Sequence, residues 1–202
     1  MIYAGNMSHL LSGLLKESEL AIVAQIASAK RNLHGARFDT YIDKVIEVLK
    51  VKCPEVNKLT SPELRDVVAM VDVWGVESRG MMKMLTDTCT GCGWCCSQTS
   101  TVIVDLEDTE RISRQLRKKR DELFVSDGKY WHIKRCCPCQ WWNPRNGHCL
   151  IYHIRPSTCR WWPLQVNEYG QDTLHNATEC NYSVMVLVYK VIGALQASEQ
   201  VQ

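Results

Sequence analysis

The sequence lacks an apolar run long enough to cross a membrane. The best candidate, residues 182–195, has only 14 residues and includes Lys190, whereas a membrane-spanning helix needs about 20 apolar residues. We therefore interpret this run as a buried or docking helix and expect no membrane partner. The N-terminal residues also lack the basic region, the unbroken apolar core and the cleavage site of a secretory signal. These features predict a cytoplasmic protein.

An excess of one charge is also missing, as are the common catalytic motifs. The chain has 24 Lys and Arg against 22 Asp and Glu, a net charge of +2, so overall charge indicates no particular partner. The basic run 117–120 is typical of a solvated helix end, and we do not expect nucleic acid as a partner. No H-E-x-x-H motif, nucleophile elbow or phosphate-binding loop is present. Beyond its cysteines the sequence therefore leaves open whether the protein is an enzyme.

Cysteine is scarce in the first part of the chain and abundant afterwards. Only Cys53 precedes position 89, while the other ten cysteines lie between positions 89 and 180. Thiols stay reduced in the cytosol, where clustered cysteines more often hold metal than form disulfides. The adjacent pairs 95–96 and 136–137 also suit a disulfide framework poorly, because neighbouring cysteines rarely bridge each other.

Apolar periodicity predicts an α+β fold that is mostly helical. The residues of segments 19–32 and 38–51 repeat at helical spacing. A third helix is expected to begin with Ser61 as its N-cap and to run towards Leu85. We predict a helical N-terminal region at 1–86, a small cysteine-rich metal-binding domain with a β-hairpin at 87–181, and a C-terminal helix and tail at 182–202.

The predicted cysteine-rich domain has its own regular elements. Residues 101–104 are β-branched and short, which is typical of a strand. Asp105 is expected to cap a helix over 107–119. Asp127 and Gly128 separate two apolar-aromatic runs and predict a hairpin over 123–134. This hairpin would deliver the second cysteine group, residues 135–139, towards the first, whereas residues 140–164 show no clear period.

The first cysteine group has the sequence CTGCGWCC, residues 89–96, with the spacing C-x2-C-x2-C-C. Thiolates are soft ligands that suit zinc, copper(I) and iron–sulfur clusters. The triple spacing is that of three ligands of a [4Fe–4S] cluster in bacterial ferredoxins, and a remote Cys-Pro can supply the fourth. Cys137-Pro138 is such a pair. The sequence therefore favours an iron–sulfur cluster as cofactor, with zinc as the alternative.

Further motifs follow in a fixed order. CLIYHIRPSTCRWWP spans residues 149–163, and VIVDLEDTERISRQL spans residues 102–116. Together with CTGCGWCC and Cys137-Pro138, they resemble the YkgJ-type cysteine-cluster family, also described as the CxxCxxCC zinc- or iron-chelating domain. The resemblance covers residues 89–164 and extends towards Cys180. It implies a set of metal ligands at Cys89, Cys92, Cys95, Cys96, Cys137, Cys149 and Cys159, with Cys180 as a further candidate.

The resemblance implies metal binding but no defined reaction. Our leading hypothesis is a protein that holds a [4Fe–4S] cluster, or iron, for electron transfer or in support of a partner enzyme, so we expect a protein partner. The alternative is a zinc-structured interaction module with no redox role. A remoter alternative is a metal-dependent enzyme, because some flagellin lysine N-methylases look like relatives of this domain. Cys136 and Cys139 are extra thiols that depart from the family pattern and leave the ligand set open.

Other residues near the cysteines admit two interpretations each. The six tryptophans between positions 94 and 162 could exclude water from a cluster or simply form the core of a loop-rich domain. Arg155 and Arg160 could offset thiolate charge or bond loop carbonyls. Three histidines, His132, His148 and His153, could each replace a cysteine as a zinc ligand, although a role in hydrogen bonding is commoner.

Overall fold

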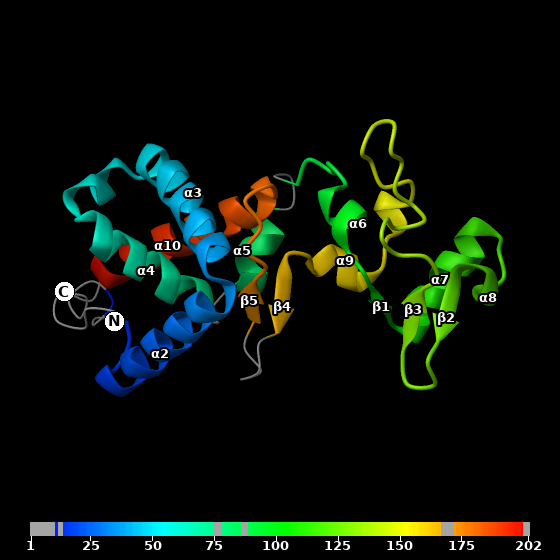
Figure 1. Ribbon diagram of the computed structural model, residues 1–202, viewed down its shortest axis with the longest axis horizontal. Helices are drawn as coiled ribbons and strands as arrows, with labels where there is room; N and C mark the ends of the chain where they lie inside the picture. The colour runs from blue at the N-terminus through cyan, green and yellow to red at the C-terminus, as the bar shows by residue number, and fades with distance from the viewer. Residues whose placement is uncertain (1–10, 12–13, 75–77, 86–88, 167–171, 200–202) are drawn as a thin grey trace. The chain divides into compact units, whose positions relative to one another are not determined.

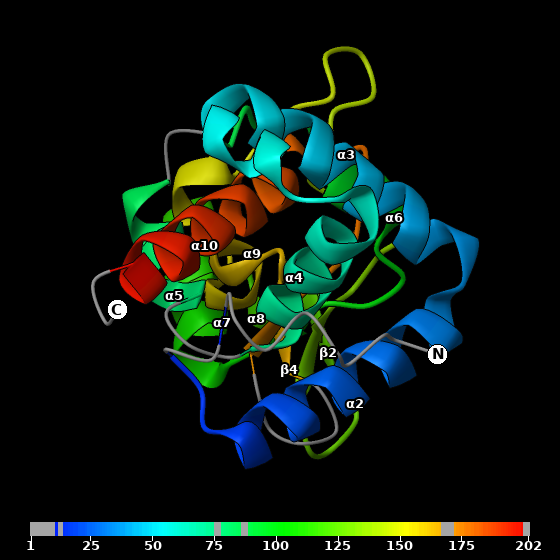
Figure 2. The same cartoon turned by 90° about the vertical axis from the view of Figure 1, so that its left-hand side faces the viewer.

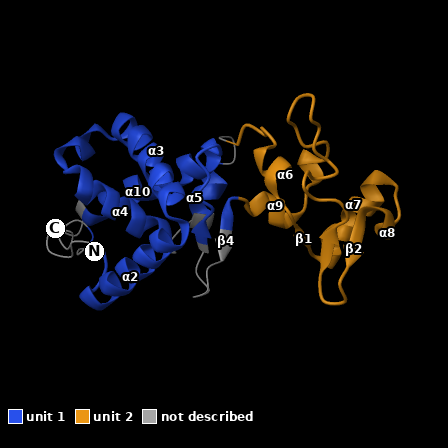
Figure 3. Ribbon diagram, in the orientation of Figure 1, with its two compact units in different colours: residues 1–88, 163–202 blue, residues 89–162 orange. Residues whose placement is uncertain are grey.

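Helices dominate the chain and confirm the predicted fold class, which includes a small three-stranded antiparallel sheet in the cysteine-rich region (Figure 1). The computed structural model describes residues 11, 14–74, 78–85, 89–166 and 172–199. By its internal contacts the chain divides into two units (Figure 3). Unit 1 consists of residues 1–88 and 163–202, and unit 2 of residues 89–162. The boundaries at 87 and 181 proposed above stay a prediction.

Unit 1 is built from helices that come from both ends of the chain. The predicted helices over 19–32 and 38–51 are confirmed. The elements of unit 1 are α2 (Glu17–His34), α3 (Ala36–Lys52), the 3-10 helix η1 (Pro54–Lys58), α4 (Ser61–Val73), α5 (Ser78–Met84), β4 (Leu164–Val166), β5 (Asp172–Leu174) and α10 (Asn181–Glu199). The strands β4 and β5 pair antiparallel and were not predicted from the sequence.

The C-terminal helix α10 packs against α3, α4 and α5 within unit 1 (Figure 2). Its residues Val184, Val186, Leu187, Val188 and Val191 are almost fully buried, as expected for a helix that is apolar around most of its circumference. Lys190 is also buried, and its Nζ donates to the Trp74 carbonyl at 2.8 Å. The interpretation of this run as a buried helix is therefore confirmed. Within the described residues, no helix is both long and apolar enough to span a membrane.

The third predicted helix begins as expected but has a different cap. Thr60, not Ser61, is the N-cap of α4, and its side chain accepts a hydrogen bond from the Glu63 backbone. Glu63 Oε2 in turn accepts from the Thr60 backbone at 2.9 Å, which completes a capping box. The helix ends at Val73 rather than near Leu85, so the predicted run is divided between α4 and α5.

A buried ion pair joins three elements of unit 1. Lys30 of α2 lies 2.6 Å from Asp72 Oδ2 of α4, and the Asp72 side chain is fully buried. The same ammonium donates to the Leu174 carbonyl of β5 at 2.9 Å, while the Asn176 amide donates to Asp72 Oδ2 at 3.4 Å. A buried charge is tolerated only with such partners, so this pair fixes how α2, α4 and β5 pack.

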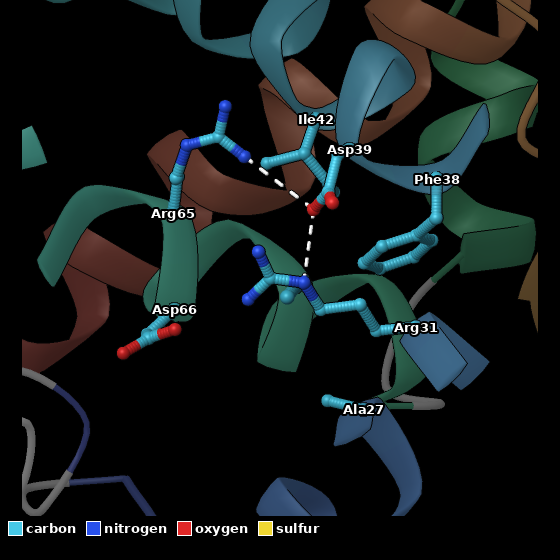
Figure 4. A pocket seen from close by; sticks show the side chains of 8 residues that line it. Ala27, Arg31, Phe38, Asp39, Ile42, Arg65 and Asp66 are labelled. Atoms are coloured by element: carbon cyan, nitrogen blue, oxygen red, sulfur yellow. Dashed lines mark ion pairs between the residues drawn. The ribbon is translucent and has the colours of Figure 1, made fainter. Parts of the chain in front are cut away.

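Figure 4 shows a second group of charges, at a small hollow between α2, α3 and α4. Asp39 accepts from Arg31 Nε at 2.9 Å and lies 3.5 Å from Arg65 Nη1. Arg65 also pairs with Asp43. The hollow has a volume of about 10 Å³, which is space for about one water molecule. These are partly exposed ion pairs that add little to stability individually.

Unit 2 combines a small sheet with short helices and long loops. The predicted strand over 101–104 is confirmed in shorter form, and the hairpin over 123–134 is confirmed with strand order β1-β3-β2. At its turn Asp127 Oδ1 accepts from the backbone of Lys129 and Tyr130. The elements are α6 (Trp94–Gln98), β1 (Ile103–Val104), α7 (Leu106–Leu116), α8 (Arg120–Leu123), β2 (Phe124–Ser126), β3 (Trp131–Ile133), the 3-10 helix η3 (Tyr152–Ile154) and α9 (Ser157–Trp161).

The predicted capping role of Asp105 is confirmed, because its side chain accepts from the Asp108 backbone at 2.6 Å. The helix α7 ends at Leu116, three residues earlier than expected, where Arg117 adopts a left-handed conformation with φ of 52°. One face of the sheet and α7 enclose the core of unit 2. This core consists of Val102, Val104, Ile112, Leu123, Phe124, Ile133, Cys139, Trp141 and Ile151.

Candidate metal centre

The first cysteine segment crosses a second loop at very close range. Gly91 and Gly93 have φ values of 65° and 71°, which glycine adopts without strain. A Cβ on Gly93 would lie 1.6 Å from the Gly147 carbonyl oxygen, and one on Gly147 would lie 2.7 Å from the Cys92 carbonyl oxygen. Both positions therefore require glycine. This crossing holds the residues before α6 against the loop that precedes Cys149.

The β-hairpin delivers the second cysteine group to the first, as predicted. After β3, the Cys139 backbone N–H donates to the Cys96 carbonyl at 2.8 Å. Cys136 lies closer to the hairpin, where its thiol donates to the Ile133 carbonyl at 3.6 Å. Residues 89–96 and 136–139 are therefore in direct contact, although more than 35 residues separate them along the chain.

A third segment adds Cys149 to this arrangement. Cys149 forms an isolated antiparallel bridge with Trp142. The neighbouring His148 places its Nδ1 3.1 Å from the Gly91 carbonyl oxygen. Because a carbonyl can only accept, Nδ1 carries the hydrogen of this bond. The loop between Trp142 and Cys149 is thus fastened directly to the first cysteine segment.

The fourth segment is the short helix α9, which carries Cys159. The Ser157 backbone N–H donates to Asp108 Oδ2 of α7 at 2.5 Å, and Thr158 Oγ1 donates to the Ile103 carbonyl of β1 at 2.6 Å. The pKa of Asp108 is lowered because the Ser157 backbone and Arg111 stabilise its carboxylate against the cost of burial. These bonds set the position of α9 against the sheet.

Four thiols from three of these segments interact through hydrogen bonds. Cys96 bonds with Cys139, Cys149 and Cys95, and these bonds raise its own pKa as the shared donor. The bond from Cys96 lowers the pKa of Cys139 and the pKa of Cys149, each to about 7. It also lowers the pKa of Cys95. We call Cys95, Cys96, Cys139 and Cys149 the inner thiols.

Two further thiols lie beside this group. Burial raises the pKa of Cys159 to about 12, and the neighbouring charges of Cys139, Cys95 and Cys149 raise it further. Burial also raises the pKa of Cys136. Protonation of these two thiols and of Cys96 is therefore favoured, while Cys95, Cys139 and Cys149 ionise more easily.

The structure brings only part of the predicted ligand set together. Cys95, Cys96, Cys149 and Cys159 gather, whereas Cys92 and Cys137 are exposed. Cys89 bonds with Tyr152 rather than with the inner thiols. Cys180 is a buried residue of unit 1, where its sulfur accepts from the Ser183 backbone at 3.4 Å. Which thiols bind metal stays a prediction.

Cys139 is the inner thiol for which the sequence left open whether it is a metal ligand. It is 7% exposed and belongs to the core of unit 2. Residues 136–141 form turns rather than a strand, so no alternation in the sequence marks Cys139 as a buried residue. Its neighbour Cys137 matched the family pattern better but faces solvent.

Every cysteine of the chain is a free thiol, so no disulfide competes with metal for these sulfurs. Among the residues that the structure describes, no group of three or more His, Cys, Asp and Glu side chains is placed so that it could hold a metal ion. Residues 88–181 match the model of the CxxCxxCC family, described as "Putative zinc- or iron-chelating domain". This segment is similar to the CxxCxxCC domain. The curated proteins and the solved structures contained no match to the chain.

The donor chemistry of residues 88–181, rather than a preformed arrangement of side chains, suits the zinc or iron that the family description names. The inner thiols offer four soft sulfur donors, which suit both zinc and iron–sulfur centres. Metal binding requires thiolates, and the lowered pKa values of Cys139 and Cys149 make ionisation near neutral pH easier. Residues 89–104 and 128–162 contain no Asp or Glu, so no carboxylate from these segments competes for the metal.

The neighbouring aromatic and basic residues serve largely structural roles. Trp141 packs against Phe124 in the core, with ring centroids 5.8 Å apart. His132 bonds to Asp127 at 2.8 Å, on the outer face of the hairpin, so it acts as a hydrogen-bonding residue there. Arg155 has both of the roles predicted for it. It bonds a loop carbonyl, that of Tyr152, at 2.9 Å, and its positive charge also lowers the pKa of Cys149.

An open cleft borders the inner thiols on one side. It is lined by Cys89, Thr90, Gly91, His148, Cys149 and Tyr152, and its volume is about 250 Å³. Cys149 is therefore the inner thiol that also borders solvent-accessible space. Burial and the bond with Cys89 raise the pKa of Tyr152, so the tyrosine hydroxyl stays protonated at neutral pH.

Proposed function

We propose that the inner thiols hold a metal centre, and that this centre is a [4Fe–4S] cluster rather than a single zinc ion. The observation that carries the proposal is the convergence of three cysteine segments: the Cys139 backbone donates to the Cys96 carbonyl at 2.8 Å, and His148, next to Cys149, bonds to the Gly91 carbonyl at 3.1 Å. Four sulfurs match the four corners of a cubane cluster. Metal ions would replace the protons that these thiols now share, as ligand deprotonation accompanies metal binding.

The surroundings of the inner thiols favour the cluster over zinc. The core of unit 2 packs Trp141 and Ile151 around the cysteines, and an apolar surrounding excludes water and tunes a cluster's potential. Such a cluster supplies one-electron chemistry when bound. We therefore propose a role in electron transfer or in support of a partner enzyme, with a protein as the partner.

Anaerobic purification followed by analysis of iron, acid-labile sulfide and zinc tests the proposal. We expect iron and sulfide in equal amounts, about four of each per chain, and a broad charge-transfer absorption in the visible range. A colourless protein with zinc and no sulfide would contradict the cluster. A protein that retains neither metal after reconstitution would contradict the metal centre altogether.

A zinc-structured interaction module is the second candidate, and one observation favours it. Residues 134–151 have little regular structure, although they carry Cys139 and Cys149. Structural zinc sites with four cysteines typically stabilise such loop-rich segments. The same purification separates the two candidates, since only the zinc protein would be colourless and would unfold when a chelator removes the metal.

A further inference from the structure

We propose that exposed cations around α8 form a docking surface for an acidic segment of a protein partner. The inference takes up the protein partner of the proposed function and adds a place on the chain and a chemistry for it. It involves neither the thiols nor a metal. Six exposed side chains from two stretches of the chain form this surface, which we call the basic surface: Arg114, Arg117, Lys118, Lys119, Lys134 and Arg135.

The positive charge of the chain is concentrated in unit 2. Residues 89–162 contain 12 Lys and Arg against 7 Asp and Glu, a net charge of +5. Because the whole chain has a net charge of +2, the residues of unit 1 have a net charge of −3. Within unit 2, residues 111–120 contain six Lys and Arg and no Asp or Glu. The nearly balanced total therefore conceals one strongly basic segment.

The structure brings the second basic stretch to the first through α8. The Lys134 backbone N–H donates to the Leu123 carbonyl at 3.0 Å, and the Lys134 ammonium donates to the Asp121 carbonyl at 2.6 Å. Helix α8 follows closely on residues 114–119 and leads into β2 (Figure 1). The basic surface is therefore wider than the solvated helix end that the run 117–120 would form by itself.

The cations of the basic surface are available to a partner. The neighbouring Glu110 pairs with Arg120, which lies outside the basic surface. Glu122 Oε1 accepts from the Lys119 backbone at 3.1 Å, where it caps α8. Among the residues that the structure describes, no side chain of the basic surface forms an ion pair with a carboxylate. Exposed charges of one sign attract and orient a partner of the opposite sign.

An exposed apolar side chain follows the basic surface along the chain. Val125 of β2 is 49% exposed and lies opposite His132 on the outer face of the sheet. Strand β2 is an edge of this sheet, whose order is β1-β3-β2. Protein interfaces combine apolar contacts with a polar rim. We therefore infer that the partner's segment carries apolar side chains among its carboxylates.

The aromatic residues of the hairpin favour a protein over a nucleic acid as the partner. Proteins that bind single-stranded nucleic acid stack its bases on aromatic rings. Here the Arg120 guanidinium lies 5.1 Å from the centre of the Trp131 ring, and the Lys129 ammonium lies 4.9 Å from the centre of the Tyr130 ring. One face of each ring is thus already covered by a cation, which leaves less of the ring for a base.

The experiment uses the full chain as purified and a fluorescently labelled peptide of glutamates and leucines as the probe. Fluorescence anisotropy measures binding. We expect the peptide to bind and its affinity to fall as salt is added, because salt screens exposed charges. A peptide with Gln in place of every Glu should bind at least about tenfold more weakly. Equal binding of the two peptides, or no binding of either, would overturn the inference.

An oligothymidylate of the same net charge tests the class of partner. We expect it to bind more weakly than the acidic peptide, because the basic surface offers it charge without free aromatic faces. Equal or tighter binding of the oligothymidylate would overturn the choice of a protein partner.

A matched pair of double variants tests the location. Lys118→Glu with Arg135→Glu reverses two charges of the basic surface and should weaken binding of the acidic peptide about tenfold or more. Lys50→Glu with Lys58→Glu makes the same change of net charge at two exposed positions of unit 1 and should bind normally. Circular dichroism checks that both variants remain folded. Equal binding by the two double variants, strong or weak, would overturn the location.

Metal analysis separates failure of this inference from failure of the proposed metal centre. A chain that holds its metal but does not bind the acidic peptide would overturn the docking surface alone. A chain that lacks metal and still binds the peptide at the basic surface would support the docking surface and contradict the metal centre.

Discussion

At the scale of single residues, Cys139 differs most from its near neighbours Cys136 and Cys137. It alone of the three bonds with Cys96. We expect Cys139→Ser to lower metal affinity by about tenfold or more, because the substitution removes a proposed ligand. Loss of a residue that only orients a ligand already lowers affinity by about this factor. Metal content after gel filtration and competition with a chelator measure the effect.

Cys136→Ser is the matched control for this prediction, since Cys136 is a neighbouring thiol that bonds to the Ile133 carbonyl. A serine hydroxyl can make the same bond, so metal content should be retained. If Cys136→Ser loses the metal and Cys139→Ser keeps it, the set of inner thiols is wrong.

The ionisation of the inner thiols predicts a pH dependence of metal affinity. The bond from Cys96 lowers the pKa of Cys139 and the pKa of Cys149 to about 7. Above this value the thiolates are available, and below it protons compete with metal. Affinity should therefore fall as the pH decreases from about 8 to about 6, measured by competition with a chelator of known proton affinity. A flat profile would show that these two thiols do not bind metal.

At the scale of elements, the crossing of Gly93 and Gly147 joins two loops that carry cysteines. In Gly93→Ala the new Cβ would overlap the Gly147 carbonyl, and a positive φ adds about 1 kcal/mol or more of strain. We expect the variant to destabilise unit 2 and to lose metal, as measured by thermal unfolding and metal analysis. Gly80→Ala is the control, because nothing lies within 4 Å of its new Cβ; equal stability of both variants would contradict a close crossing.

The ion pair between Lys30 and Asp72 gives a prediction for the helices of unit 1. In Asp72→Ala the buried ammonium of Lys30 would lose its carboxylate, which typically costs about 3–5 kcal/mol. Asp43→Ala removes a more exposed partner of Arg65 and should cost less than about 1 kcal/mol. Chemical denaturation of both variants checks this, and similar losses would show that the buried pair has no special role.

Sequence patterns predicted elements well where local chemistry decides the conformation. The periodicity of α2 and α3, the cap at Asp105 and the turn at Asp127 and Gly128 each depend on residues close in the chain. Thr60 replaced Ser61 as a cap because both have a suitable hydroxyl and only one lies three residues before Glu63, which completes the capping box. The strands β4 and β5 each have only three residues, too few for a period to be recognised.

The candidate site was predictable in composition but not in detail. The spacing of residues 89–96 and the family resemblance indicated a thiol cluster, and the hairpin correctly brought the second group to the first. The choice between Cys137 and Cys139 depends on which side chain faces Cys96, and that is decided by the hydrogen bond from the Cys139 backbone. The cleft could not be predicted, because it depends on the approach of Gly91 to His148, 57 residues later in the chain.

At the scale of the whole molecule, the two units should respond differently to removal of metal. Unit 1 has its own apolar core around α10, whereas much of unit 2 consists of loops around thiols. A ligand that binds only the folded state stabilises that state. Chelation should therefore lower the unfolding temperature of unit 2 and leave that of unit 1 unchanged, as seen in calorimetric scans with and without metal. A uniform shift of a single transition would contradict this.

Because residues 163–202 complete unit 1, its helices cannot assemble fully on the ribosome until the entire cysteine segment has been translated. Helix α10 packs against α3 and α4, so these two helices stay incompletely packed until α10 has been synthesised. The thiols of residues 89–162 emerge during this interval and can be loaded before the helical unit closes. The order of synthesis thus makes these thiols accessible to a metal before the final folding step.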